Sequence, residues 1–290
     1  MALKKLADKD ELGNPVAHFF KSGNVLRGKE FDSLIKLKEL IPTSSPQGCN
    51  VEYDIWYDFS EGNKIHGYCY TDTLTQFIYL RVASCKYAKK AMKEAASGPI
   101  TEEGERLFKE IADNSVDKYR LRKKGIKHDF VIFLPGTNIL NTVVDFDKVD
   151  RAVKQGAMLK CHPLTSPPAF EHLKHRWGNA VIDKKVSGHE LLENAAIVGY
   201  CNNSEMGMVA LAKGKTTYHF GYNNVWMTYT AIYKALEVDG VLREPRFKAI
   251  LSSKYSGLVP ATIENPHERI DSFFKQYSEV PHVLPKNTNN

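Results

Sequence analysis

The sequence predicts an α/β fold made of two Rossmann-like lobes with a cleft between them. Between residues 128 and 221, short apolar segments alternate with amphipathic helical segments, as in a parallel sheet buried on both faces. Such strands are joined by right-handed βαβ crossovers, and ligands bind beyond their carboxyl ends. The first part of the chain has strand and helix patterns of its own, which predict the second lobe.

We place the boundary near residue 126, giving parts at 1–126, 127–265 and 266–290, the last a C-terminal helix and tail. Aromatic and β-branched residues indicate strands in the first part, and Gly98-Pro99 interrupts its helical pattern. The elements expected there are strands at 15–20, 51–59 and 64–70, and helices at 29–40, 74–96 and from 101.

The second part alternates more regularly. Gly214 stands where a helix C-cap belongs, and Pro266 lies near the first turn of the last helix. The expected strands are 129–134, 157–160, 179–182, 196–200 and 215–220. The expected helices are 146–155, 168–176, 189–194, 204–213 and 266–279.

Composition is that of a water-soluble globular protein, with 42% hydrophobic and 26% charged residues among 290. No apolar run approaches the roughly 20 residues needed to span a bilayer, so we expect no membrane anchor. The start, MALKKLADKDEL, lacks the apolar core of a secretory signal. Five widely spaced cysteines fit reduced thiols better than a disulfide framework, and together these features predict a cytoplasmic protein.

Polar residues follow three of the expected strands, and together they suit a phosphate and a ribose. The carboxyl ends of parallel strands meet at one edge of the sheet, where ligands bind. We therefore predict a nucleotide site there. Its candidate residues are Gly136, Thr137, Lys160, His162, Asn203, Ser204 and Glu205.

Each of these candidates also has a plainer interpretation. His162, held at the strand end by Pro163, can donate a hydrogen bond to a phosphate, or it can simply cap or pack a loop. Ser204 can help bind an anion at a helix start, and Glu205 can accept ribose hydroxyls. The alternative for both is an ordinary helix N-cap followed by a first-turn acid.

Other ligand-binding signatures are weak or missing. The sequence contains neither GxxxxGK[ST] nor GxGxxG, so P-loop enzymes and ordinary dinucleotide enzymes lose support. His172 and His175 share a helix but supply at most two ligands, and we predict no metal site.

The order K-x-H-P, helix, strand, N-N-S-E, A-L-A-K-G-K and T-T-Y-H-F-G over residues 130–221 resembles the nucleotide-binding lobe of GT-B-fold glycosyltransferases. The nearest pattern is that of capsule Kdo transferases and bacterial sialyltransferases. The resemblance implies that His162 and Ser204 contact the donor phosphate and that Glu205 binds ribose. It also implies a GT-B-like pair of lobes, with acceptor-side residues 1–126 and nucleotide-sugar-binding residues 127–265. No bound cofactor is implied, and the co-substrate is a nucleotide sugar, with a UDP-sugar favoured over a CMP-sugar. This chain departs from the pattern in having Asn-Asn-Ser where paired serines are usual.

An inverting transfer needs a general base for the acceptor hydroxyl. Asp72, directly after an expected strand, is our candidate catalytic residue; its alternative role is an N-cap, and Asp54 and Asp58 are further candidates. The loop after the first expected strand is predicted to contact donor or acceptor, and consists of Lys21, Ser22, Gly23 and Asn24.

Two basic clusters have a solvated surface as their default interpretation, and a track for a polyanionic partner as the alternative. The first has helical spacing and the second is a dense run: Lys86, Lys89, Lys90 and Lys93, then Arg122, Lys123 and Lys124. Small basic enzymes of GT-B-like shape resemble phage enzymes that glycosylate hydroxymethylated cytosine. The preferred function is therefore sugar transfer to hydroxymethylated or already glycosylated cytosine in phage double-stranded DNA, in the host cytoplasm.

Three alternatives remain open. One is a soluble capsule or lipopolysaccharide glycosyltransferase that uses a CMP- or UDP-sugar. Another is a nucleotidyl or phosphoglycerol transferase that shares the His-Pro pattern and takes a cytidine diphosphate donor. The third belongs to a different class, a non-catalytic protein that binds nucleotides or nucleic acid, because a fold does not establish chemistry.

Overall fold

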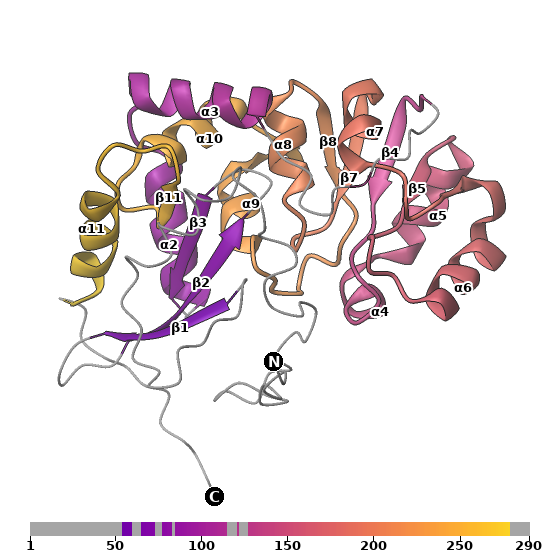
Figure 1. Cartoon of the computed structure of the whole chain (residues 1–290), viewed down its shortest axis with the longest axis horizontal. Helices are drawn as coiled ribbons and strands as arrows, with labels where there is room; N and C mark the ends of the chain where they lie inside the picture. The colour runs from indigo at the N-terminus through magenta and orange to yellow at the C-terminus, as the bar shows by residue number, and fades with distance from the viewer. Residues whose placement is uncertain are drawn as a thin grey trace, which may run out of the picture.

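The computed structural model describes residues 54–59, 65–72, 77–82, 85–114, 121 and 127–278. These residues form a five-stranded parallel sheet and a four-stranded antiparallel sheet, with helices packed around both (Figure 1), and a further pair of short antiparallel strands. The elements expected at 15–20 and 29–40, the Lys21–Asn24 loop and the cluster of Arg122, Lys123 and Lys124 lie outside the described residues.

The parallel sheet confirms the alternating pattern read from the second part of the chain. Its five strands lie in the order β6-β5-β4-β7-β8, and every neighbouring pair is parallel. Chain order therefore runs outward from β4 on one side and then returns to its other side, as in a Rossmann-like α/β fold. The strands are β4 (Phe130–Phe133), β5 (Met158–Lys160), β6 (Val181–Ile182), β7 (Ile197–Tyr200) and β8 (Thr216–His219).

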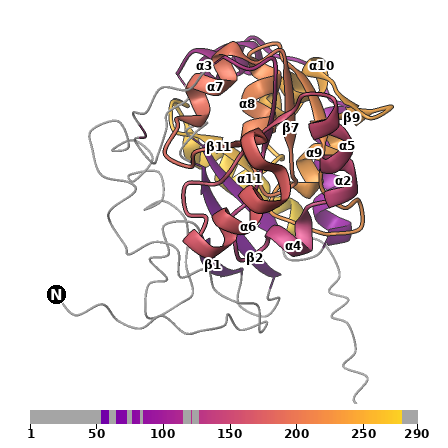
Figure 2. The same ribbon diagram turned by 90° about the vertical axis from the view of Figure 1, so that its right-hand side faces the viewer.

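Helices cover both faces of this sheet because its strands are apolar on both sides. Val131 and Ile132, neighbours on β4, are both fully buried but belong to different hydrophobic clusters. The cluster on one face includes residues of α5 and α6, and the cluster on the other includes residues of α7 and α8. Figure 2 views the molecule from the end where α5 and α6 lie. The helices are α4 (Leu140–Val143), α5 (Phe146–Lys154), α6 (Pro167–Trp177), α7 (Gly188–Asn194) and α8 (Met206–Ala212).

Local signals explain where several of these helices begin and end. The Asp145 carboxylate accepts a hydrogen bond of 3.1 Å from the Lys148 amide and so caps α5. Prolines occupy the first positions of α6, where a missing N–H is not needed. Gly214, expected as a C-cap, has φ of +69°, a left-handed conformation that favours glycine.

The other sheet is antiparallel, with strand order β1-β2-β3-β11. A Rossmann-like lobe needs parallel strands, so the described residues do not show the predicted two-lobe GT-B arrangement. The last strand of this sheet comes from the predicted second part of the chain and pairs with β3. The strands are β1 (Asp54–Phe59), β2 (Ile65–Asp72), β3 (Phe77–Val82) and β11 (Leu258–Pro260).

The helix expected at 74–96 is wrong in its first half. Residues 77–82 are strand β3, and helix α2 begins only at Cys85. Phe77, Ile78 and Leu80 are almost completely buried, which explains the apolar run: both of its faces are covered, so it shows no period of two.

Helices α9 and α10 and strands β9 and β10 were not predicted, and they connect the two sheets. Helix α9 packs on α2, and α10 packs on α3. A single hydrophobic cluster includes Leu80 of β3 and Val198 of β7, so one core runs through both sheets. The remaining elements are α2 (Cys85–Ala96), α3 (Glu102–Asn114), α9 (Thr230–Leu236), β9 (Glu237–Val238), β10 (Val241–Leu242), α10 (Glu244–Ser252) and α11 (Pro266–Ser278).

In the described part of the chain, no helix combines the length and the apolar character needed to cross a membrane.

Candidate functional site

A cavity of about 120 Å³ lies at the carboxyl ends of β4, β5 and β7. This is the edge where the strand order reverses around β4, the usual ligand position in open α/β sheets. Five of the seven predicted nucleotide-site residues line it, together with one residue that sequence analysis missed. The polar lining residues are Lys160, His162, Asn203, Ser204 and Glu205, and the addition is His189.

His162 is oriented by its own loop. Its Nδ1 accepts a hydrogen bond of 3.2 Å from the Leu164 amide, and its carbonyl accepts one of 2.9 Å from the Thr165 amide. Because Nδ1 is an acceptor, the neutral ring carries its proton on Nε2. The loop-capping interpretation of His162 is therefore confirmed, and its contact with a phosphate stays a prediction.

The loop after β7 is held by hydrogen bonds of its own. The Ser204 hydroxyl oxygen accepts a hydrogen bond of 3.2 Å from the Met206 amide. The N-cap of the helix that follows is Glu205, so the plainer interpretation, Ser204 as N-cap followed by a first-turn acid, is wrong. The Ser204 O–H proton is not used in the bond to the Met206 amide and can be donated elsewhere. The Asn203 Oδ1 atom is buried and receives no hydrogen bond from any described residue. An acceptor in that state gains from a ligand that brings a donor.

Glu205 is only 6% exposed and stands one residue before α8, at its N-cap position. Its Oε1 accepts a hydrogen bond of 3.2 Å from the Tyr229 hydroxyl. The carboxylate is thus built into the cavity wall by a residue of the unpredicted segment 222–265.

Lys160 places a positive charge in the wall of the cavity. Its side chain is 3% exposed, and its ammonium donates to the carbonyl oxygens of Cys161 at 2.6 Å and Lys184 at 3.0 Å. A buried ammonium raises the electrostatic potential of a small, poorly hydrated site and favours an anion there. Burial raises the pKa of the Cys161 thiol to about 11, against the opposing effect of Lys160 and Lys184, so this cysteine is not a thiolate at neutral pH.

Gly136 and Thr137, also predicted for the nucleotide site, are adjacent to the cavity but do not line it. A Cβ added at Gly136 would lie 3.8 Å from His162 Nδ1. The Thr137 hydroxyl accepts a hydrogen bond of 2.8 Å from the Ser166 amide and so ties the loop after β4 to the loop after β5. Thr137 therefore supports the arrangement of the site.

His189 is the lining residue that sequence analysis missed. It comes from the start of α7, which follows the fourth strand end of the sheet, β6, whereas only three strand ends were considered. The neighbouring Gly188 allows α7 to approach β4, because a Cβ there would lie 3.2 Å from the Phe133 ring. The glycine next to a histidine was the available signal.

Asp72, the predicted base, is the last residue of β2 and pairs with Phe77 in the antiparallel sheet. The expected strand-to-helix junction is absent from the described residues, because the next described element is strand β3. The N-cap alternative for Asp72 is therefore wrong, and its role as a base stays a prediction. Asp54 and Asp58 belong to β1.

The basic face expected on α2 is confirmed as an exposed surface. All four of its lysines, Lys86, Lys89, Lys90 and Lys93, are exposed. Lys90 lies 3.9 Å from Glu94, and the Lys89 ammonium lies 5.1 Å from the centre of the Trp226 ring. The face thus combines cations with an aromatic side chain.

His219, at the end of β8, is a second perturbed group near this edge of the sheet. Burial lowers its pKa to about 4, and the charges of Lys148 and Lys234 add to that effect. Its Nδ1 lies 3.3 Å from Asn223 Oδ1, and this contact and Asp145 act in the opposite direction. The imidazole is therefore neutral at physiological pH.

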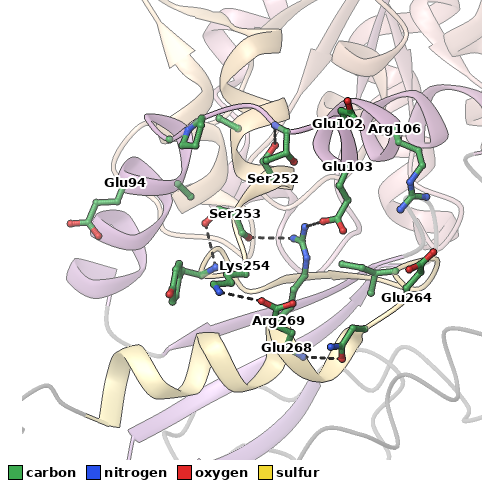
Figure 3. Close-up of a pocket in the computed structure, with 18 of the residues that line it drawn as sticks. Glu94, Glu102, Glu103, Arg106, Ser252, Ser253, Lys254, Glu264, Glu268 and Arg269 are labelled. Atoms are coloured by element: carbon green, nitrogen blue, oxygen red, sulfur yellow. Dashed lines mark hydrogen bonds and ion pairs between the residues drawn. The ribbon is translucent and has the colours of Figure 1, made fainter.

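A larger hollow of about 1180 Å³ lies between α2, α3 and α11 (Figure 3). Its buried charge, Arg269, is directed at Glu103 and at backbone carbonyls, so that the guanidinium joins the surrounding elements. Lys254 and Glu268 pair with each other at 3.1 Å. Because the buried Arg269 is bound by Glu103 and by backbone, and Lys254 is paired with Glu268, we place the functional site at the smaller cavity.

Comparisons with protein-family models, curated proteins and solved structures give no match to this chain. The chemistry therefore rests on the residues of the cavity. Among the described residues, no group of three or more His, Cys, Asp and Glu side chains is arranged to hold a metal ion. Fold and lining together make this cavity, at the carboxyl edge of a Rossmann-like sheet, the candidate site for a small ligand.

Proposed function

We propose that this protein binds the phosphate portion of a nucleotide sugar in the cavity and transfers the sugar to a hydroxyl acceptor. The observation that carries the proposal is the meeting of His162 and Ser204 at the carboxyl edge of the sheet. They come from different strand ends, and both side chains line the same cavity as the buried Lys160.

In the proposed transfer step, the protein itself forms no covalent bond with the sugar. The acceptor oxygen attacks the anomeric carbon, the bond from that carbon to the phosphate oxygen breaks, and the phosphate leaves with the electron pair. The acceptor proton passes to a base, for which Asp72 is our proposal. Donors from His162 and Ser204, and the charge of Lys160, would stabilise the negative charge that develops on the phosphate.

The volume of the cavity bears on how a donor would sit. At about 120 Å³ it is smaller than the roughly 300–1,000 Å³ of sites that enclose drug-sized ligands. We therefore propose that a phosphate or ribose group enters the cavity and that the rest of the nucleotide sugar lies outside it.

The acceptor that we propose is duplex DNA carrying hydroxymethylated cytosine, in a phage-infected cytoplasm. Its support is the exposed lysine face of α2 with Trp226 beside it. Replacing all four lysines with glutamine should weaken DNA binding and lower the salt dependence of log K by up to about 0.9 for each lost phosphate contact. Unchanged DNA binding would favour the capsule or lipopolysaccharide acceptor instead.

A non-catalytic nucleotide-binding protein is the second candidate. The observation in its favour is that Glu205, the only carboxylate among the lining residues described, is buried and bonded to Tyr229. Turnover assays with Asp72→Asn distinguish the two: loss of transfer with nucleotide binding retained supports the enzyme. Equal transfer by the variant would remove Asp72 from the mechanism.

The first test is a thermal-shift panel of UDP, CMP, CDP, GDP and ADP. A nucleotide at about 100 times its Kd adds about 2.7 kcal/mol of stability, which raises Tm by about 5–10 °C. His162→Gln should abolish the shift, whereas His172→Gln, on the exposed surface of α6, should keep it. A UDP response favours the glucosyl-type donor and a CMP response the Kdo or sialyl type. No response to any of the five would overturn the proposal.

A further inference from the structure

Residues of helix α9 and its N-cap form hydrogen bonds with the loop that carries Asn203, Ser204 and Glu205. This helix belongs to a segment far along the chain, and it packs on α2. Two tyrosines, at its N-cap and on its first turn, are directed at the loop. Both are almost completely buried, with Tyr229 4% and Tyr233 1% exposed.

Tyr233 fixes the backbone at Ser204. Its hydroxyl donates to the Ser204 carbonyl oxygen at 2.5 Å. The ring stacks on Tyr200 of β7 with centroids 4.2 Å apart, so the hydroxyl cannot swing away without disturbing the core. Helix α8 fits against this pair only because residue 207 is glycine: a Cβ there would lie 2.7 Å from both the Tyr233 oxygen and the Tyr200 ring.

Tyr229 fixes the same loop at two other points. Its amide donates to the Asn202 carbonyl oxygen at 2.9 Å, and its hydroxyl donates to Glu205 Oε1 at 3.2 Å. On its other side the ring stacks on Tyr79 of β3, with centroids 6.2 Å apart. Through Tyr229, the Glu205 carboxylate in the cavity wall is therefore connected to the antiparallel sheet.

We propose that Tyr229 and Tyr233 are positioning residues that hold Glu205 and Ser204 at the cavity. The hydrogen bonds of Ser204 with Cys201 and Met206 join residues of the loop and the helix start to one another. The two phenol groups add bonds from a distant helix, which fix the loop relative to the rest of the fold. The identity of the ligand in the cavity rests on the proposed function. The fixing of the loop by Tyr229 and Tyr233 does not depend on that function.

The test compares Tyr229→Phe and Tyr233→Phe, which lose only a hydroxyl, with Tyr200→Phe, which loses one from the same aromatic stack. Amide hydrogen exchange is measured over residues 201–206 in the ligand-free protein. Losing one of these bonds should raise exchange there about two- to tenfold, with little change in the strands of the parallel sheet. Exchange equal to that of Tyr200→Phe would overturn the proposal.

Nucleotide binding is then measured by titration calorimetry with whichever of the five nucleotides stabilises the parent protein. Both phenylalanine variants should raise Kd about two- to tenfold, while Tyr200→Phe leaves it unchanged. If the loop loosens and Kd stays the same, the tyrosines do not position the binding groups and the proposal fails. If the loop loosens in a protein that binds no nucleotide, the positioning stands and the proposed function falls.

Discussion

Arg269 provides the sharpest test of how the helices around the antiparallel sheet are held together. The side chain, on α11, is 3% exposed and ion-pairs with Glu103 of α3. Its guanidinium also donates to the carbonyl oxygens of Leu251 at 2.6 Å, Leu258 at 3.1 Å and Ser253 at 3.3 Å. One residue thus connects α3, α10, β11 and α11 at the wall of the larger hollow (Figure 3).

Arg269→Met removes the charge and all of these donors while keeping a long apolar stem. Breaking a buried ion pair on one side costs about 3–5 kcal/mol, and each buried carbonyl left without a donor about 1–3 kcal/mol. The costs do not add in full, because the Glu103 side chain is 41% exposed and can rehydrate, and water can enter the open hollow. We expect a loss of about 3–5 kcal/mol, a large share of a typical domain stability of about 5–15 kcal/mol.

Urea unfolding followed by circular dichroism measures this loss directly. Lys254→Met is the matched control, because its pair with Glu268 joins side chains that are 46% and 56% exposed and should contribute less than about 1 kcal/mol. The stability loss of Arg269→Lys should lie between those of Arg269→Met and Lys254→Met, because one ammonium cannot reach every acceptor. A change below about 1 kcal/mol for Arg269→Met would refute the reasoning.

Three further outcomes are expected. Gly207→Ala should cost about 1–3 kcal/mol in urea unfolding, because the added methyl would meet the Tyr233 hydroxyl at 2.7 Å; an unchanged midpoint would contradict this. His219, with its pKa lowered to about 4, stays neutral when folded but protonates near pH 6.5 when unfolded, so stability should fall by at most about 3 kcal/mol as pH drops from 6.5 to 4. His219→Gln should flatten that part of the Tm profile. Exposed Cys85 should react with iodoacetamide in the native protein, whereas buried Cys161, with its pKa raised to about 11, should react only on unfolding.

The parallel sheet could be predicted because the signals for its strands and helices lie within short stretches of the sequence. Each strand is a short apolar run and each helix has an apolar face, and the polar residue that ends a strand is next to it in sequence. His162 follows Lys160 of β5 by two residues, so it was certain to lie at the sheet edge once the strand was correctly identified. Ser204 follows the end of β7 in the same way.

The antiparallel sheet depends on contacts that the sequence does not display. Strand β3 lies between β2 and β11, and its pairing with Leu258–Pro260 joins segments separated by most of the chain. Its buried residues Phe77–Leu80 form a continuous apolar run. Such a run is found both in buried helices and in strands that are covered on both faces, so it does not distinguish them. Length was the better guide, because the continuous apolar run covers only residues 77–80 before Arg81 interrupts it.

The residues that hold the loop of the candidate site were also missed, because they too are distant in sequence from the groups they contact. Tyr229 and Tyr233 lie 24 and 29 residues beyond the groups they bind, in a helix with no polar face to mark it as part of a site. Read alone, YTAIYKAL (229–236) is a short and mostly apolar segment, and its two tyrosines look like packing residues. Their rings do pack, but the hydroxyls point at Glu205 and at the Ser204 carbonyl. The residues that line the candidate site could therefore be read from strand ends, whereas the positions in which they are held depend on a helix that only the folded chain brings to them.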